Sequence, residues 1–181
     1  MPMEKSEIKQ RARELLAAGQ GGTATFAQLS GQGLKDKQLA TVIASYADPV
    51  LTEAHRGKVR VLIVIMLIQV IFAFFVGYGI GYKIGPNAPW IASALMALVP
   101  LAFAWAFYAN KAVAYEAYVL LSILGVARTL DGFVTAPLNA ATGLAISVAL
   151  CSFVLYVQFK IFPDLLFLSP KKVAGKFVFS N

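Results

Sequence analysis

The chain has 181 residues, of which 59% are hydrophobic and 14% are charged. Because soluble domains carry about 25% charged residues, this composition excludes an ordinary soluble protein and favours one that lies in a membrane. The formal net charge is +7. Since the cytoplasmic flanks of membrane helices collect Lys and Arg, this charge does not lead us to expect nucleic acid as a partner.

Two residue types that occur once each exclude several kinds of site. Cys151 is the only cysteine and His55 is the only histidine. The sequence therefore cannot form an intramolecular disulfide, a CxxC redox pair, a metal site built from cysteines, or a haem site with two histidine ligands. No cluster of Asp, His and Ser residues points to catalysis. We predict no catalytic residues, no cofactor and no bound metal, and hence that the protein is not an enzyme.

Four apolar runs predict an all-α integral membrane protein with a four-helix transmembrane bundle. The first run, Val61 to Tyr82, contains no charged residue. It reaches the roughly 20 residues that a helix needs to cross a hydrocarbon core about 30 Å thick. The other three runs cover about 89–109, 112–130 and 138–160. Pro100 lies near the middle of the second run, where it predicts a kink.

The segments on either side of the bundle complete the predicted organisation. Residues 1–51 form a cytoplasmic helical region, with helices over 3–18 and 34–47 and a turn of helix over 25–29. This region is too short to bury a core by itself, so we expect it to dock on the bundle or on a partner. Thr52 is the expected cap of a helix that continues into the first span. The membrane domain thus covers 52–162, and residues 163–181 form a cytoplasmic tail, extended or lying on the membrane surface.

The charges predict the orientation. Lys and Arg are concentrated in the N-terminal region, and the C-terminal tail adds Lys171, Lys172 and Lys176. Four crossings bring these two segments to the same side of the membrane. By the positive-inside rule we expect both termini in the cytoplasm of a bacterium, with the protein in its inner membrane.

Glycines at the end of the first span are the most specific pattern in the sequence. Gly77, Gly81 and Gly85 are spaced by four residues. Small residues at this spacing let two membrane helices approach closely, so they predict a helix-packing surface or a partner interface. Gly85 belongs to this surface only if the helix continues past Lys83.

Four polar residues in or near the spans are further candidates. Ionisable groups inside a membrane are functional candidates by default. Glu116 is the acid nearest the membrane interior, and pairing with Lys111, Lys160 or a tyrosine hydroxyl is the simpler alternative to a role in transport. Arg128 and Asp131 are spaced i, i+3 and predict a salt bridge at a helix end or a contact for a partner. Gln69 is expected to form a hydrogen bond between helices.

These patterns favour a non-catalytic membrane protein that acts through protein–protein contacts in the bilayer. Its partners are the lipid bilayer and either another membrane protein or a second copy of the chain. An assembly subunit of a membrane complex and an immunity- or exclusion-type protein both remain open. A small transporter or channel subunit is the alternative, supported by Glu116, Gln69 and the kinked second span.

Overall fold

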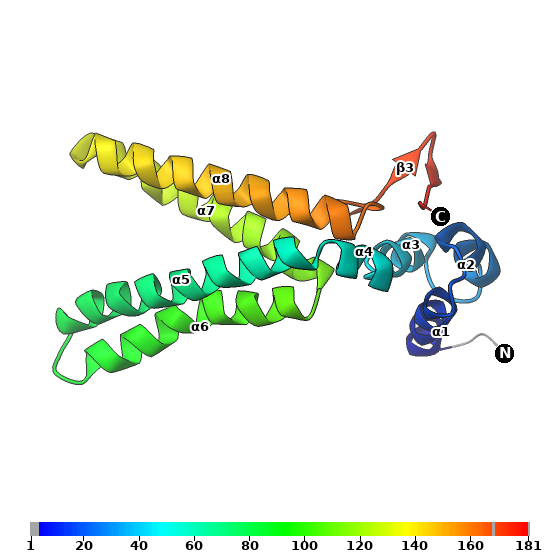
Figure 1. Ribbon diagram of the computed structural model, residues 1–181, viewed down its shortest axis with the longest axis horizontal. Helices are drawn as coiled ribbons and strands as arrows, with labels where there is room; N and C mark the ends of the chain where they lie inside the picture. The colour runs from blue at the N-terminus through cyan, green and yellow to red at the C-terminus, as the bar shows by residue number, and fades with distance from the viewer. Residues whose placement is uncertain (1–3, 168, 181) are drawn as a thin grey trace.

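The computed structural model describes residues 4–167 and 169–180, and the side chains of residues 127–135 lie outside what it describes. Within this part the chain is mostly helical and contains eight helices (Figure 1). They are α1 (Lys5–Ala17), α2 (Gly22–Leu29), α3 (Asp36–Ala44), α4 (Pro49–Ala54), α5 (Arg56–Tyr82), α6 (Ala88–Tyr108), α7 (Ala112–Thr135) and α8 (Pro137–Ile161). Four two-residue strands follow: β1 (Leu165–Leu166), β2 (Ser169–Pro170), β3 (Lys172–Val173) and β4 (Lys176–Phe177).

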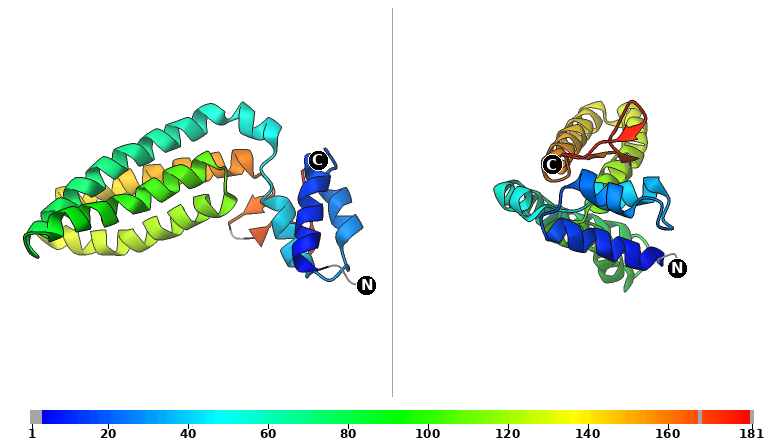
Figure 2. Two further views of the ribbon diagram at one scale, coloured as in Figure 1. Left: turned by 90° about the horizontal axis from the view of Figure 1, so that it is seen from below. Right: turned by 90° about the vertical axis from the view of Figure 1, so that its right-hand side faces the viewer.

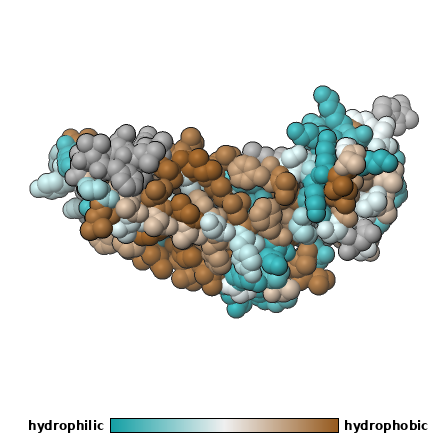
Figure 3. Space-filling model, turned by 90° about the horizontal axis from the view of Figure 1, so that it is seen from above, coloured by the Kyte–Doolittle hydropathy of each residue, from teal (hydrophilic) through white to brown (hydrophobic). Residues whose placement is uncertain are grey.

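Three of the long helices have the length and composition of membrane spans, as expected for a membrane protein. Among the described residues, α5, α6 and α8 are long and apolar enough to cross a bilayer. Helix α7 has 24 residues, but its described apolar part, Ala112–Val126, is shorter than a full span. The expected four-helix transmembrane bundle is thus borne out only in part. Figure 3 shows hydrophobic side chains over much of the long helices and hydrophilic ones gathered towards the end that carries α1–α3.

The long helices form two antiparallel hairpins. Helix α5 packs along α6, and α7 packs along α8, whereas α5 touches α8 and α6 touches α7 over short stretches only. The hairpins meet near α4 and diverge towards their far ends (Figure 1). Burial follows the same gradient: in α7 the side chains from Ala114 to Tyr118 are mostly buried, but Leu120 to Leu124 are mostly exposed.

The N-terminal helices form a small core with the C-terminal tail. Helices α1, α2 and α3 pack against one another, burying Ile8, Leu29 and Leu39. Phe26 of α2 contacts the rings of Phe177 and Phe179, with centroids 5.5 and 5.7 Å away. The region that is too short to bury a core alone is therefore completed by the far end of the chain, and both termini lie at the same end of the molecule (Figures 1 and 2).

The tail forms short extended strands, which is one of the two expected forms, and it folds against the N-terminal helices. Strand β1 pairs with β2 and β3 pairs with β4, both antiparallel, and β2 packs on α3. Gly22 of α2 permits the close approach of Phe179, because a Cβ on Gly22 would stand only 2.8 Å from Cβ of Phe179. Nine of the fifteen residues from Leu165 to Phe179 are hydrophobic, which favours their burial against the N-terminal helices.

The entry into the first long helix also differs from the prediction. Asp48, not Thr52, caps the helix before α5: its Oδ1 accepts a hydrogen bond from the Val50 backbone N–H at 2.7 Å, and Pro49 occupies the first turn. Thr52 lies inside α4, which ends at Ala54, and the backbone at His55 leaves helical geometry before α5 begins at Arg56. Proline suits the first turn of a helix, so Asp48-Pro49 starts α4. It does not end the preceding helix as expected, because α3 already ends at Ala44.

Candidate functional site

The glycines of α5 lie directly against α6 of the same chain. A Cβ on Gly77 would come within 2.7 Å of the Ala92 carbonyl oxygen, and one on Gly81 would come within 2.5 Å of the Ala88 carbonyl oxygen. Neighbouring backbone cannot yield as a flexible side chain can, so both positions require glycine for this approach. The surface they form is therefore filled within the chain and is not open to a partner.

Gly85 does not belong to this surface. Helix α5 ends at Tyr82, so the stripe stops before Lys83, and a Cβ on Gly85 would meet nothing within 4 Å. Aromatic side chains provide further contacts between α5 and α6. The Trp90 ring of α6 lies 5.6 Å from Tyr78 and 6.4 Å from Phe74 of α5, centroid to centroid.

The two hairpins meet at a cluster of rings, which we call the hairpin junction. Phe107 of α6 is fully buried and its ring contacts Tyr115 and Tyr118 of α7, with centroids 4.7 and 6.0 Å away. Phe162, just after α8, closes the cluster against Tyr115 at 5.9 Å. Edge-on and tilted ring pairs of this kind contribute about 0.5–1.5 kcal/mol each beyond their buried area.

Two of the predicted polar residues belong to this junction. Gln69 Nε2 of α5 donates a hydrogen bond to the Tyr118 hydroxyl of α7 at 3.1 Å, so it bridges helices as the sequence indicates. Glu116 is 5% exposed, and its Oε1 accepts a hydrogen bond from Gln158 Nε2 of α8 at 3.5 Å. The junction therefore contains one polar contact between the hairpins and another within the second hairpin.

Gln158 is the partner that sequence reasoning missed. It lies near the end of α8, next to Phe159 and Lys160, where a glutamine reads as an ordinary residue at the membrane boundary. The structure buries it completely because it falls on the same face of α8 as Val154, Val157 and Ile161. The sequence contains one sign of this burial: Gln158 has helical spacing with three apolar residues, so it shares their face of the helix.

Two oxygens at the junction are buried without a hydrogen-bond partner in the described part of the chain. They are the Tyr115 hydroxyl and the Gln158 side-chain carbonyl. An unpaired buried polar atom costs about 1–3 kcal/mol. Hydrogen bonding among the described residues of the junction is therefore incomplete at these two oxygens.

The remaining predicted residues, Arg128 and Asp131, belong to α7. Their side chains lie outside the part that the structure describes. Their predicted salt bridge stays a prediction.

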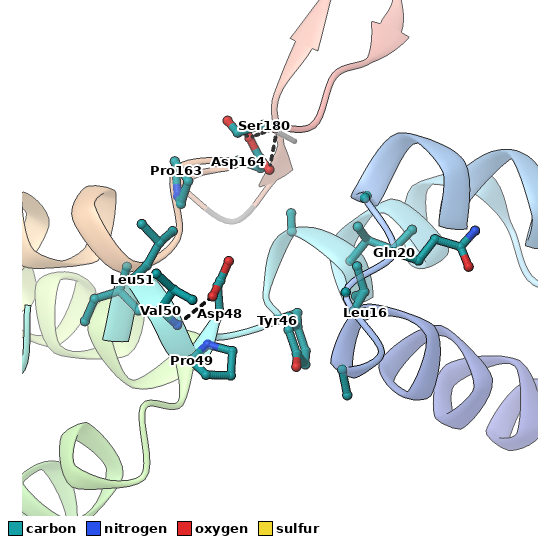
Figure 4. A pocket seen from close by; sticks show the side chains of 17 residues that line it. Leu16, Gln20, Tyr46, Asp48, Pro49, Val50, Leu51, Pro163, Asp164 and Ser180 are labelled. Atoms are coloured by element: carbon teal, nitrogen blue, oxygen red, sulfur yellow. Dashed lines mark hydrogen bonds between the residues drawn. The ribbon is translucent and has the colours of Figure 1, made fainter. Parts of the chain in front are cut away.

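A cavity of about 560 Å³ lies away from the junction, between the N-terminal helices, α4, the end of α8 and the tail (Figure 4). Two carboxylates line it. Asp48 caps α4, and Asp164 accepts hydrogen bonds from the Ser180 N–H at 2.8 and 2.9 Å and from the Ser180 hydroxyl at 2.7 Å. Both carboxylates therefore fix the backbone that forms the cavity wall.

Neither region resembles a metal centre. Among the described residues, no three His, Cys, Asp or Glu side chains come together in a way that could hold a metal ion. Comparison of the chain with models of protein families, with curated proteins and with solved structures gives no match in any of the three.

Proposed function

We propose that the protein is a non-catalytic membrane protein that crosses the bilayer with four helices and acts through contacts with another membrane protein. An assembly subunit of a membrane complex and an immunity- or exclusion-type protein are the two forms this function can take. In the proposed arrangement the protein lies in a bacterial inner membrane, and α7 crosses together with α5, α6 and α8.

Charge supports a cytoplasmic location for both termini. Arg56, Lys58 and Arg60 precede or begin the first span, and Lys111 and Lys160 lie at the ends of later helices. All five belong to the end of the hairpins that faces α1–α3, as the antiparallel order of the long helices requires. Basic residues are retained on the cytoplasmic side.

Cysteine labelling tests this orientation. In a Cys151→Ala background, a membrane-impermeant thiol reagent added to intact cells should label a cysteine at Asn87, in the α5–α6 turn, and should not label one at Ser180. The reverse pattern, or labelling of both, would contradict the orientation.

The observation that carries the proposed function is a pair of facing helix surfaces that stay exposed beyond the hairpin junction. Gln69 of α5 and Tyr118 of α7 touch. Val76 lies seven residues after Gln69, and Leu121 lies three residues after Tyr118, so each continues the same helix face. Both side chains are nonetheless about half exposed, at 52% and 51%.

A transmembrane helix of a partner suits these surfaces. Helices in lipid gain little hydrophobic energy by meeting, so close packing supplies their attraction. Two diverging hairpins offer a third helix contacts on both sides, whereas a flat helix surface offers them on one side only. The proposed partner contact therefore lies between the far halves of the hairpins, with lipid alone as the competing occupant.

Copurification with matched variants tests the proposal. Tagged wild-type protein, extracted in mild detergent, should retain a second membrane protein in fixed ratio. Val76→Trp adds bulk to the proposed contact and should remove that protein while leaving the melting temperature unchanged. Ile71→Trp is the control: Ile71 is 58% exposed but lies about 200° around α5 from Gln69, so the partner should remain.

Loss of the partner in both variants, or in neither, would contradict the proposed contact. So would a wild-type protein that purifies from its native membrane without any stoichiometric companion.

A transporter or channel subunit is the second candidate, and the buried pair of Glu116 and Gln158 favours it. A carboxylate inside a membrane protein can carry a proton or a cation. Proteoliposomes that enclose a pH-sensitive dye separate the two candidates. Under an imposed potential we expect wild type and Glu116→Gln to pass protons no faster than empty vesicles, whereas a flux that Glu116→Gln abolishes would support transport.

A further inference from the structure

A second hollow, which we call the Lys111 groove, lies on the outer surface where α6 turns into α7. Its volume is about 320 Å³. Four alanines, Ala102, Ala106, Ala114 and Ala117, line it together with Trp105 and Lys111, and their small side chains leave it open. The surface exposed inside the groove is apolar, so Lys111 lines it with its methylene groups and not with its ammonium.

In the proposed arrangement of the helices in the membrane, the groove lies at the edge of the bilayer. The turn that contains Lys111 lies at the same end as the basic flank of α5. Trp105, 60% exposed, and the exposed Tyr108 stand beside this turn, and such aromatic side chains collect at the level of lipid headgroups. The apolar part of the groove therefore faces acyl chains while Lys111 faces the headgroups.

Lys111 is held at the mouth of the groove by a ring rather than by an acid. Its Nζ lies 4.0 Å from the centroid of the Trp105 ring, a distance typical of a cation–π contact. The ion pairs among the described side chains involve Arg11 with Glu14 and Arg56 with Glu53, and no carboxylate pairs with Lys111. The ammonium is thus oriented but keeps its positive charge available to an anion.

The start of α7 adds to this positive charge. Lys111 directly precedes α7, and the Ala114 N–H donates to its carbonyl oxygen at 2.9 Å; the N–H groups of Ala112 and Val113, ahead of it, have no acceptor within the helix. The N-terminal end of a helix carries roughly half a positive charge. An anion beside Lys111 would meet both the ammonium and these N–H groups.

We propose that the Lys111 groove binds one anionic phospholipid, with an acyl chain along the alanines and the phosphodiester beside Lys111 and the first turn of α7. The apolar groove and the cation at its mouth match the two parts of such a molecule. A zwitterionic lipid fits less well, because its own ammonium or choline group is repelled by Lys111.

Native mass spectrometry of the purified full-length protein in detergent tests this inference, with phosphatidylglycerol and phosphatidylcholine as the added lipids. We expect wild type to bind one phosphatidylglycerol about tenfold more tightly than phosphatidylcholine, a difference of about 1.4 kcal/mol. Lys111→Gln should abolish that preference. Lys160→Gln is the matched control: this lysine lies at the same membrane boundary, with Nζ 5.9 Å from the Tyr156 ring centroid, and its loss should change binding less than twofold.

Ala102→Leu provides a second variant that keeps the charge and fills the groove. Ala102 is exposed, so the larger side chain should leave the melting temperature unchanged and weaken the binding of both lipids. Equal effects of Lys111→Gln and Lys160→Gln, equal affinity of wild type for the two lipids, or unchanged binding by Ala102→Leu would each overturn the inference.

Discussion

The two hairpins have the same topology but are held together by different contacts. In the α5–α6 hairpin, Gly77 and Gly81 bring two backbones into direct contact, and Trp90 adds ring contacts with Phe74 and Tyr78 beside them. In the α7–α8 hairpin, Gly125 has no atom within 4 Å of where a Cβ would stand. Among the described side chains of this hairpin, the large buried ones lie near the junction, at Tyr115 and Val119 in α7 and at Val154 and Val157 in α8.

A glycine in a membrane helix therefore indicates close packing only once the neighbouring helix is known. Close backbone packing fixes the distance between α5 and α6 along the length of the hairpin. Beyond the junction, the side chains from Leu120 to Leu124 of α7 are mostly exposed. The first hairpin is therefore the more rigid unit on this account, and the position of the second depends on the junction.

The largest effect should come from removing the ring at the centre of the junction. Phe107→Ala should cost about 3–5 kcal/mol, because Phe107 is fully buried and a large cavity replaces it. The melting temperature of the purified protein in detergent should fall steeply. Phe75→Ala, at an exposed phenylalanine of α5, is the control and should change the melting temperature little. Similar decreases in melting temperature for both variants would mean that the junction does not hold the hairpins together.

A somewhat smaller effect should come from the glycine contact. Gly81→Leu should destabilise the protein by about 1–3 kcal/mol or more, because the new side chain runs into the backbone at Ala88 and Pro89. Gly79→Leu in the same helix and Gly125→Leu in the other hairpin place their side chains in open space and should be nearly neutral. Thermal unfolding of the three variants measures these effects. A loss for Gly125→Leu as large as that for Gly81→Leu would contradict the difference between the hairpins.

The smallest effect should come from the hydrogen bond between the hairpins. Tyr118→Phe removes the hydroxyl that accepts from Gln69 and should cost about 0.6 kcal/mol, the average for side-chain hydrogen bonds between membrane helices. Thermal unfolding beside the Phe107→Ala variant measures this difference. A Tyr118→Phe loss as large as that of Phe107→Ala would show that the polar contact, rather than the rings, positions the second hairpin.

Hydropathy predicted the long helices well because burial in lipid depends on composition and length. The run from Val61 to Tyr82 lies within α5, and the runs at 89–109 and 138–160 correspond closely to α6 and α8. The cap before α5 was misassigned because Thr52 and Asp48 both suit a helix start. Only the position of Pro49 in the first turn distinguishes them.

Contacts between distant segments could not be predicted in the same way. The four-residue spacing of Gly77 and Gly81 indicates that some helix approaches, but a periodic pattern does not identify α6 as that helix. Glu116 meets Gln158 across 42 residues of sequence, and the fold of the tail depends on Phe26 at the opposite end of the chain. Each of these contacts depends on the turns between the long helices, which local patterns do not specify.

Photo-crosslinking in the native membrane tests the proposed partner contact most directly. A photoreactive phenylalanine analogue at Val76 faces the space between the diverging hairpins, and one at Ile71 points away from it. We predict that irradiation at Val76 joins the protein to a second polypeptide of defined mass, and that irradiation at Ile71 does not. Adducts to a second polypeptide at neither position, with lipid adducts at both, would contradict a protein contact at this surface.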